Sequence, residues 1–148
     1  MATVEKSVLV LFSAHQMFEL VRGVDSYPEF LPWCSAGHAE RQAPDLEKAT
    51  VEINFKGVKQ TFCTLNRIEL DQAIHMTLEE GPFTELTGEW RFVALAADAC
   101  KVMFRLDYEF SSKVLEQLVG PVFHSIANSF VDSFIRRAEA LHGVDDAP

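Results

Sequence analysis

The chain has 148 residues, which is a usual size for one domain and enough to bury a core without disulfide or metal staples. Hydrophobic residues make up 48% of the sequence and charged residues 24%, a balance that excludes a mostly disordered chain. The formal net charge of −9 argues against a DNA-binding surface, because such surfaces depend on clustered Lys and Arg. We therefore expect a single domain over residues 1–148 with no DNA partner.

The cysteines and the start of the chain indicate the compartment. Cys34, Cys63 and Cys100 are far apart and never in CxxC or CxxH spacing, so we expect reduced, buried thiols. No two of the histidines and cysteines have the spacing of zinc ligands, so we predict no metal site. The first twelve residues hold a short apolar run and no signal-peptide layout. We expect a cytoplasmic protein without a transmembrane segment, and leave open a peripheral position and transient contact at the inner membrane.

The first elements predicted along the chain are a strand at residues 3–12 and a helix at residues 14–22. Ser13 stands where the helix needs an N-cap, since its hydroxyl can accept a hydrogen bond from a free backbone N–H. A second, short helix is predicted to be capped by Ser26 and ended by Pro32.

Between residues 37 and 110 the hydrophobic pattern changes to period two, which is typical of strands. The predicted strands are residues 38–43, 50–55, 58–69, 72–79, 86–95 and 100–110. The breaks between them are short and rich in turn residues, as antiparallel hairpins require. Alternation is clearest near the end, where Trp90 and Phe92 share one face and Glu89 and Arg91 the other. One face of the sheet is therefore expected to be buried and the other wet.

The last predicted element is a long helix from residue 112 to about residue 141. Its apolar residues recur with a period near 3.6 and form one stripe, made of Leu115, Leu118, Val119, Val122, Phe123, Ile126 and Phe130. Pro121, beside Gly120, is expected to kink or restart the helix, while His124 falls on its polar side. A sheet with one apolar face needs a cover, and this helix is the only predicted element long enough to provide it.

Four motifs in this order carry a family resemblance over about residues 3–142. They are YPEFLPWC (27–34), NFKG (54–57), GPF followed by LTGEWRF (81–83 and 86–92), and GPVF (120–123). The chain resembles the START-like polyketide cyclase/dehydrase superfamily, within it the branch of coenzyme-Q-binding proteins and bacterial RatA ribosome-association toxins. The resemblance implies an α+β helix-grip (START/Bet v 1-like) fold, in which a curved antiparallel sheet of about seven strands wraps around the last helix with a lipid-sized tunnel between them.

Twelve Phe residues against two Trp and two Tyr suggest that this interior is wide. The inward residues could simply pack as a core, or they could line a ligand cavity on the fold that the resemblance implies. Trp33 is a candidate for the cavity mouth, with an apolar face inward and its N–H outward. The full set of candidate ligand-binding residues is Trp33, Phe62, Trp90, Phe92, Phe104, Tyr108, Leu118, Val122, Ile126 and Phe130.

Nucleophilic catalysis is not expected. Cys63 and His75 lie on neighbouring predicted strands, but their parities do not demand contact and no acid is clearly placed behind His75. The first functional expectation is therefore binding of ubiquinone, another polyisoprenoid quinone or a similar lipid in support of respiration, with no obligatory cofactor. The alternative is a ribosome-association toxin that blocks subunit joining through a protein surface, with the large ribosomal subunit as partner. A cyclase/dehydrase-type enzyme is the second alternative.

Overall fold

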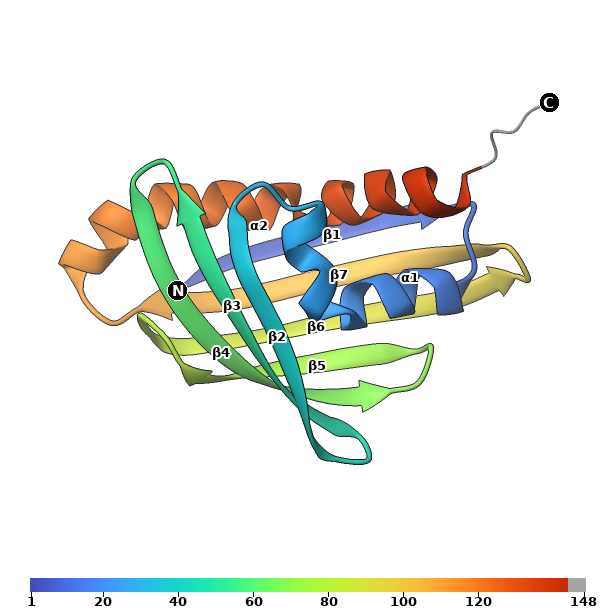
Figure 1. Cartoon of the computed structure of the whole chain (residues 1–148), viewed down its shortest axis with the longest axis horizontal. Helices are drawn as coiled ribbons and strands as arrows, with labels where there is room; N and C mark the ends of the chain where they lie inside the picture. The colour runs from blue at the N-terminus through green and yellow to red at the C-terminus, as the bar shows by residue number, and fades with distance from the viewer. Residues whose placement is uncertain (144–148) are drawn as a thin grey trace.

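The computed structural model describes residues 1–143, which form seven strands, two α-helices and one 3-10 helix (Figure 1). In chain order these are β1 (Ala2–Val10), α1 (Ala14–Arg22), η1 (Val24–Glu29), β2 (Cys34–Ala43), β3 (Leu46–Phe55), β4 (Val58–Glu69), β5 (Ala73–Glu80), β6 (Phe83–Ala96), β7 (Ala99–Phe110) and α2 (Lys113–His142). The expected α+β class and the expected order of elements are confirmed. Among these residues, no helix has both the length and the hydropathy needed to cross a membrane.

The strands form one antiparallel sheet in the order β1-β7-β6-β5-β4-β3-β2. From β2 to β7, each strand pairs with the next in sequence through a short turn. Strand β1 pairs with β7 and forms one edge of the sheet. The turn between β3 and β4 has Lys56 and Gly57 at positive φ, the backbone that matches the twist of a two-residue hairpin. The predicted sheet of about seven strands joined by hairpins is confirmed.

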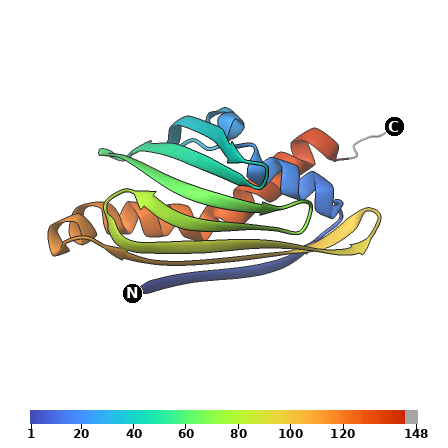
Figure 2. The same ribbon diagram turned by 90° about the horizontal axis from the view of Figure 1, so that it is seen from below.

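Helix α2 lies inside the curve of the sheet, with β2, β3 and β4 bending over it and β1, β6 and β7 on its other side (Figure 2). Its inward side chains, including Phe123, Ile126 and Phe134, are buried against the concave face of the sheet. Burial of this one apolar face by one helix is the main source of the core, as the sequence pattern predicts.

Helix α1 begins where predicted because its N-cap is fully used. The Ser13 hydroxyl accepts a hydrogen bond from the Gln16 backbone N–H at 3.0 Å, and the Gln16 side chain accepts one from the Ser13 N–H at 2.9 Å. The short second helix differs from the prediction. It is the 3-10 helix η1, which begins at Val24 instead of after a Ser26 cap, because Val24 and Tyr27 are buried and their packing sets its position.

Several strand boundaries differ from the prediction, most of all the starts of two strands. Strands β2 and β3 each begin four residues earlier than the alternation suggests, at Cys34 and Leu46. Strand β2 carries register shifts near both of its ends, and a bulge breaks the period-two pattern on which the prediction depends.

The long helix α2 continues through Pro121 without a restart, contrary to the expected interruption. Proline removes one N–H, so the carbonyl of Gln117 loses its usual partner. Gln117 and Pro121 both lie on the exposed side of α2, where water can hydrate that carbonyl. The missing hydrogen bond therefore costs little, and the helix continues through Pro121.

Candidate ligand cavity

A cavity lies between the concave face of the sheet and α2. Seventeen residues line it, and only Thr64 and Asn66 among them have fully polar side chains. The lining consists of Val24, Tyr27, Trp33, Ala49, Val51, Ile53, Phe62, Thr64, Asn66, Met76, Leu86, Phe104, Leu106, Phe123, Ile126, Ala127 and Phe130. Such a surface binds mainly through apolar contact, with the few polar groups left to fix orientation.

Half of the ten residues predicted from the sequence line this cavity. These five are Trp33, Phe62, Phe104, Ile126 and Phe130. Three others, Trp90, Phe92 and Tyr108, are buried in the core but lie outside the lining, where they support the wall. Val122 is half-buried at the edge of the helix face, also outside the lining.

Leu118 was placed wrongly, because its side chain is 67% exposed. Val114, which lies one turn earlier on the same side of α2, is exposed as well. On the same turns Leu115 packs against the core and Val119 is 4% exposed, so the buried face of α2 is narrower than the apolar stripe. The helical period identifies an apolar stripe, but it does not say how much of its width is covered.

Two aromatic clusters account for the many Phe residues. Towards the start of α2, Phe123 packs against Phe83 and Tyr108 at centroid distances of 5.0 and 4.8 Å. Further along the helix, Phe130 packs against Trp33 at 5.9 Å and Trp90 at 5.7 Å. Phe123 and Phe130 both line the cavity, so each cluster contributes at least one large ring to its wall.

The cavity is small for a ring-bearing ligand. Its volume is about 70 Å³, whereas an engineered apolar cavity of roughly 150 Å³ is needed to hold benzene. Phe62, Met76 and Phe130 line the cavity and are only partly buried, so they are the side chains with room to move outward. Met76 stands opposite Gly88 in the sheet, and its methyl group occupies the space that a side chain on Gly88 would need. Because methionine is flexible, rotation of Met76 away from Gly88 would widen the cavity.

Polar atoms in the lining are few and specific. The Thr64 hydroxyl donates a hydrogen bond to the Asn66 side-chain oxygen at 2.7 Å. The Tyr27 hydroxyl donates to the Val21 backbone oxygen at 2.5 Å, and burial raises the pKa of Tyr27. Trp33 is 6% exposed, and among residues 1–143 its indole Nε1 has no hydrogen-bond partner. The expected outward orientation of this N–H is therefore wrong, because the donor is buried within the wall.

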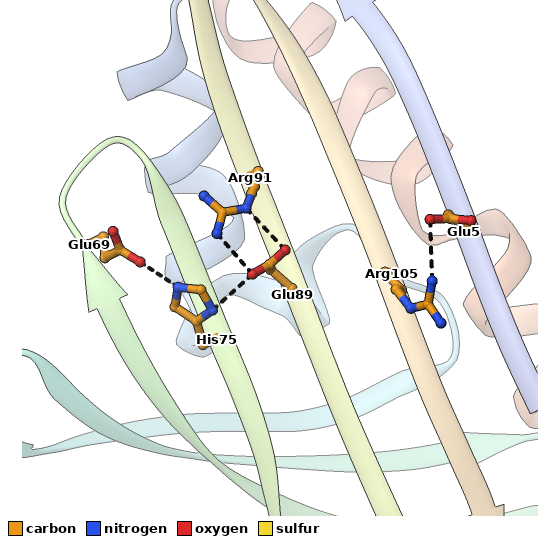
Figure 3. A network of polar contacts seen from close by, with 6 residues as sticks. All are labelled: Glu5, Glu69, His75, Glu89, Arg91 and Arg105. Atoms are coloured by element: carbon orange, nitrogen blue, oxygen red, sulfur yellow. Dashed lines mark hydrogen bonds and ion pairs between the residues drawn. The ribbon is translucent and has the colours of Figure 1, made fainter. Parts of the chain in front are cut away.

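The convex face of the sheet carries a charged network instead of a cavity (Figure 3). His75 contacts Glu69 through Nε2 and Glu89 through Nδ1, the latter at 3.1 Å, and Glu89 also pairs with Arg91. The hydrogen bond from His75 lowers the pKa of Glu69 below its ordinary value. Sequence reasoning missed these acids behind His75, because Glu69 approaches from the neighbouring strand β4 and Glu89 from β6.

The cysteines take no part in this network. All three are free and buried, as predicted, and burial raises the pKa of Cys34 to about 11. The Cys63 sulfur lies 3.5 Å from the Thr50 hydroxyl, while both ring nitrogens of His75 contact carboxylates. A protonated thiol without a histidine beside it is a poor nucleophile. Within residues 1–143, no three His, Cys, Asp or Glu side chains are grouped to hold a metal ion.

His124 is exposed on α2, as expected, but it also reaches the sheet. Its Nδ1 lies 3.0 Å from the Tyr108 hydroxyl, which links the polar side of the helix to β7. Burial raises the pKa of Tyr108, so this hydroxyl stays protonated over the ordinary pH range.

Comparison with known proteins gives the same picture of the family. The model of the family described as polyketide cyclase / dehydrase and lipid transport matches residues 10–135. The ribosome association toxin RatA of Vibrio cholerae is 43% identical over 97% of this chain and 99% of its own length. The persistence and stress-resistance toxin PasT of Escherichia coli is 39% identical, over 96% and 90% of the two chains.

A more distant relative is the mitochondrial coenzyme Q-binding protein COQ10 homolog B of Xenopus laevis, which is 25% identical over 97% of this chain and 60% of its own length. Two solved structures share the fold. An 18 kDa protein from Caulobacter crescentus is 29% identical with a TM-score of 0.76, covering 97% of this chain and all of its own. The Zhui aromatase/cyclase of Streptomyces is 17% identical with a TM-score of 0.81, covering 97% and 99% of the two chains.

Proposed function

The chain belongs to the polyketide cyclase/dehydrase and lipid transport family, and we propose that it binds a polyisoprenoid quinone, such as ubiquinone, or a similarly apolar lipid. The observation that carries this proposal is the cavity, which has two polar side chains in a lining of seventeen residues. The similarity to a coenzyme Q-binding protein over 97% of the chain supports the same ligand class. A carrier of such a ligand would work from the cytoplasm, contact the inner membrane to exchange it, and so support respiration.

The energetics suit an apolar ligand. An isoprenoid tail offers no hydrogen bonds, so its affinity must come from buried area, at about 0.8 kcal/mol for each CH₂ before the costs of association. The cavity as it stands holds only a small part of such a molecule. Binding would therefore move the partly buried side chains Phe62, Met76 and Phe130 and extend the site towards solvent. Part of the tail would then lie along the surface between the sheet and α2.

Binding is favoured over catalysis by the state of the reactive groups. The thiol of Cys34 has a pKa of about 11, and the pKa of Cys100 is also raised by burial, so both stay protonated at neutral pH. His75 is engaged by two carboxylates on the convex face, away from the cavity. We accordingly propose a binding protein with no obligatory cofactor, not a cyclase or dehydrase.

The test is organic extraction of protein purified from a quinone-producing host, followed by mass spectrometry. We expect a quinone or another long-chain lipid in the extract, and saturable uptake of added quinone by the delipidated protein. A matched control is the variant Ile126→Asp, which places a charge in the lining and should carry less lipid. Lipid-free extracts together with unsaturable uptake would contradict the proposal.

Ribosome association is the second candidate, because relatives of 38% to 43% identity over nearly the whole chain are named for it. The charge distribution limits the form that this activity could take. Most of the arginines that could meet RNA are paired with carboxylates, including Arg22 with Glu47 and Arg137 with Glu29. The net charge of −9 would instead favour a basic ribosomal protein as the partner.

Sedimentation of ribosomal subunits with added protein tests this second candidate. Binding to protein-free rRNA across a salt series should be measured alongside. If the activity exists, we expect an effect on subunit joining with weak binding to bare rRNA. Tight rRNA binding that falls linearly in log salt would instead indicate direct phosphate contacts. Unchanged subunit joining at all concentrations would remove this candidate.

A further inference from the structure

One wall of the cavity carries a buried hydrogen-bond donor that the protein does not use. Trp33 is 6% exposed and lines the cavity, and within residues 1–143 nothing accepts a hydrogen bond from its Nε1–H. An indole can only donate, so no rotation turns this group into an acceptor. Buried donors are nearly always paired in folded proteins, which makes an unpaired one in a cavity wall an indication of a ligand acceptor.

A second donor comes from β4. Asn66 is 8% exposed and lines the same cavity, and its side-chain oxygen already accepts a hydrogen bond from the Thr64 hydroxyl. That bond fixes the orientation of the carboxamide and leaves its NH₂ group as the free part. In the part of the chain that the structure describes, no side-chain hydrogen bond from this NH₂ group is present. Trp33 and Asn66 therefore each offer a hydrogen-bond donor to the cavity. The hydroxyls of Tyr27 and Thr64 donate their own hydrogens and keep lone pairs that can accept.

Asn66 stands directly opposite Met76 in the sheet, and Met76 lines the same cavity and is only partly buried. Because methionine is flexible, movement of this side chain would open space beside the Asn66 carboxamide. Trp33 lies elsewhere in the same lining.

Such a wall distinguishes a quinone from a plain hydrocarbon. A quinone has two carbonyl oxygens that can accept hydrogen bonds from these two donors. A plain hydrocarbon would leave Trp33 and Asn66 unpaired, and unpaired buried groups weaken binding.

Resting on the proposed function, we infer that the cavity prefers ligands with carbonyl acceptors, such as a quinone, to plain hydrocarbons, with Trp33 Nε1–H and the Asn66 carboxamide as the donors. A hydrogen bond of ordinary net strength corresponds to roughly a three- to tenfold difference in affinity.

The experiment measures the binding of two probes to the delipidated protein. The probes are a benzoquinone with a decyl tail and a decylbenzene without oxygen substituents. We expect the quinone to bind roughly three- to tenfold more tightly than decylbenzene. The variant Trp33→Phe should reduce this preference while leaving the affinity for decylbenzene almost unchanged.

Two further variants keep the outcome decisive. Trp90→Phe removes the other indole, which is buried outside the cavity lining, and should leave the preference for the quinone intact. Asn66→Leu tests the second donor, and it serves as the readout if Trp33→Phe does not fold. Equal affinities for the quinone and decylbenzene in the wild-type protein, or a preference unchanged by both donor variants, would overturn this inference and leave the proposed function standing. Failure of both probes to bind would overturn both.

Discussion

Two adjacent rows of residues cross the same five strands and face opposite sides of the sheet. The inner row, facing α2, consists of Asn66, Met76, Gly88, Leu106 and Val4. The outer row, one residue away on each strand, consists of Arg67, His75, Glu89, Arg105 and Glu5. The two rows share backbone, register and hydrogen-bond ladder, so any difference in their behaviour comes from side chains and solvent.

The two rows differ in their exposure to water, and this difference sets how strongly a substitution in each row affects stability. Three residues of the inner row, Asn66, Met76 and Leu106, line the cavity. A substitution in this row therefore loses buried apolar contact or leaves a buried polar group without a hydrogen bond. The outer row carries acids and bases that pair at the surface, as Figure 3 shows for His75 with Glu89 and for Arg105 with Glu5. Pairs of this kind are screened and contribute little to stability. The inner face is therefore the part of the molecule where sequence determines both folding and binding.

The largest loss of stability is expected from a charge introduced on the inner side. Ile126→Asp would bury an unpaired carboxylate in the cavity wall and should lower the free energy of unfolding by about 4 kcal/mol. The matched control is Leu118→Asp, eight residues earlier on the same helix at a position that is 67% exposed. That variant should change the free energy of unfolding by about 0.5 kcal/mol or less. Urea titration of both variants checks the result, and similar losses in the two would contradict the orientation of α2.

A smaller effect is expected from the flexible member of the inner row. Met76→Ala removes a partly buried side chain and should cost about 1–2 kcal/mol, less than the cost at a fully buried site. Because the cavity becomes larger, affinity for a ring-bearing probe should rise at the same time. Denaturation and binding measured on one preparation separate the two effects. Reduced stability with unchanged binding would show that Met76 does not limit the cavity.

Ionisation of a buried thiol gives a pH-dependent effect on the inner side. The pKa of Cys34 is raised from 9.0 to about 11, chiefly by burial. Its stabilising contribution is thus complete below pH 9 and is lost as the pH rises towards 11. Alkaline unfolding should therefore begin at higher pH in the variant Cys34→Ala than in the wild type, each compared with its own stability at pH 8. Identical alkaline profiles would rule out this role for Cys34.

The smallest effects belong to the outer face. Hydrogen bonds from Arg105 and Thr3 lower the pKa of Asp107. The contribution of this carboxylate to stability is therefore present above its ordinary pKa of 3.8 and is lost as the pH falls below that value. At neutral pH, Arg105→Gln should shift the melting temperature only slightly, and less still in high salt. A large loss that persists in 1 M salt would show that the outer row has a structural role equal to that of the inner row.

Sequence patterns predict the two rows unequally well. In the middle of β6 and β7, apolar residues alternate with mostly polar or charged ones, so the inward face that includes Trp90 and Phe104 could be identified from the sequence. Thr64 and Asn66 could not, because a period-two pattern places polar residues on the wet face and these two are buried by the curvature of β4 over α2. Leu118 was predicted wrongly for the opposite reason, since it fits the helical period but lies beside the buried face, which includes its neighbour Val119.

Fluorescence titration of the delipidated protein with a short-chain quinone tests most directly whether the inner face is the binding site. The chain has two tryptophans, Trp33 in the cavity lining and Trp90 in the wall behind it, 5.7 Å from Phe130. We predict saturable quenching of both with one quinone bound per chain, retained in Leu118→Asp and lost in Ile126→Asp. Quenching that stays linear and unsaturable, or that persists equally in both variants, would contradict a ligand site between the sheet and α2.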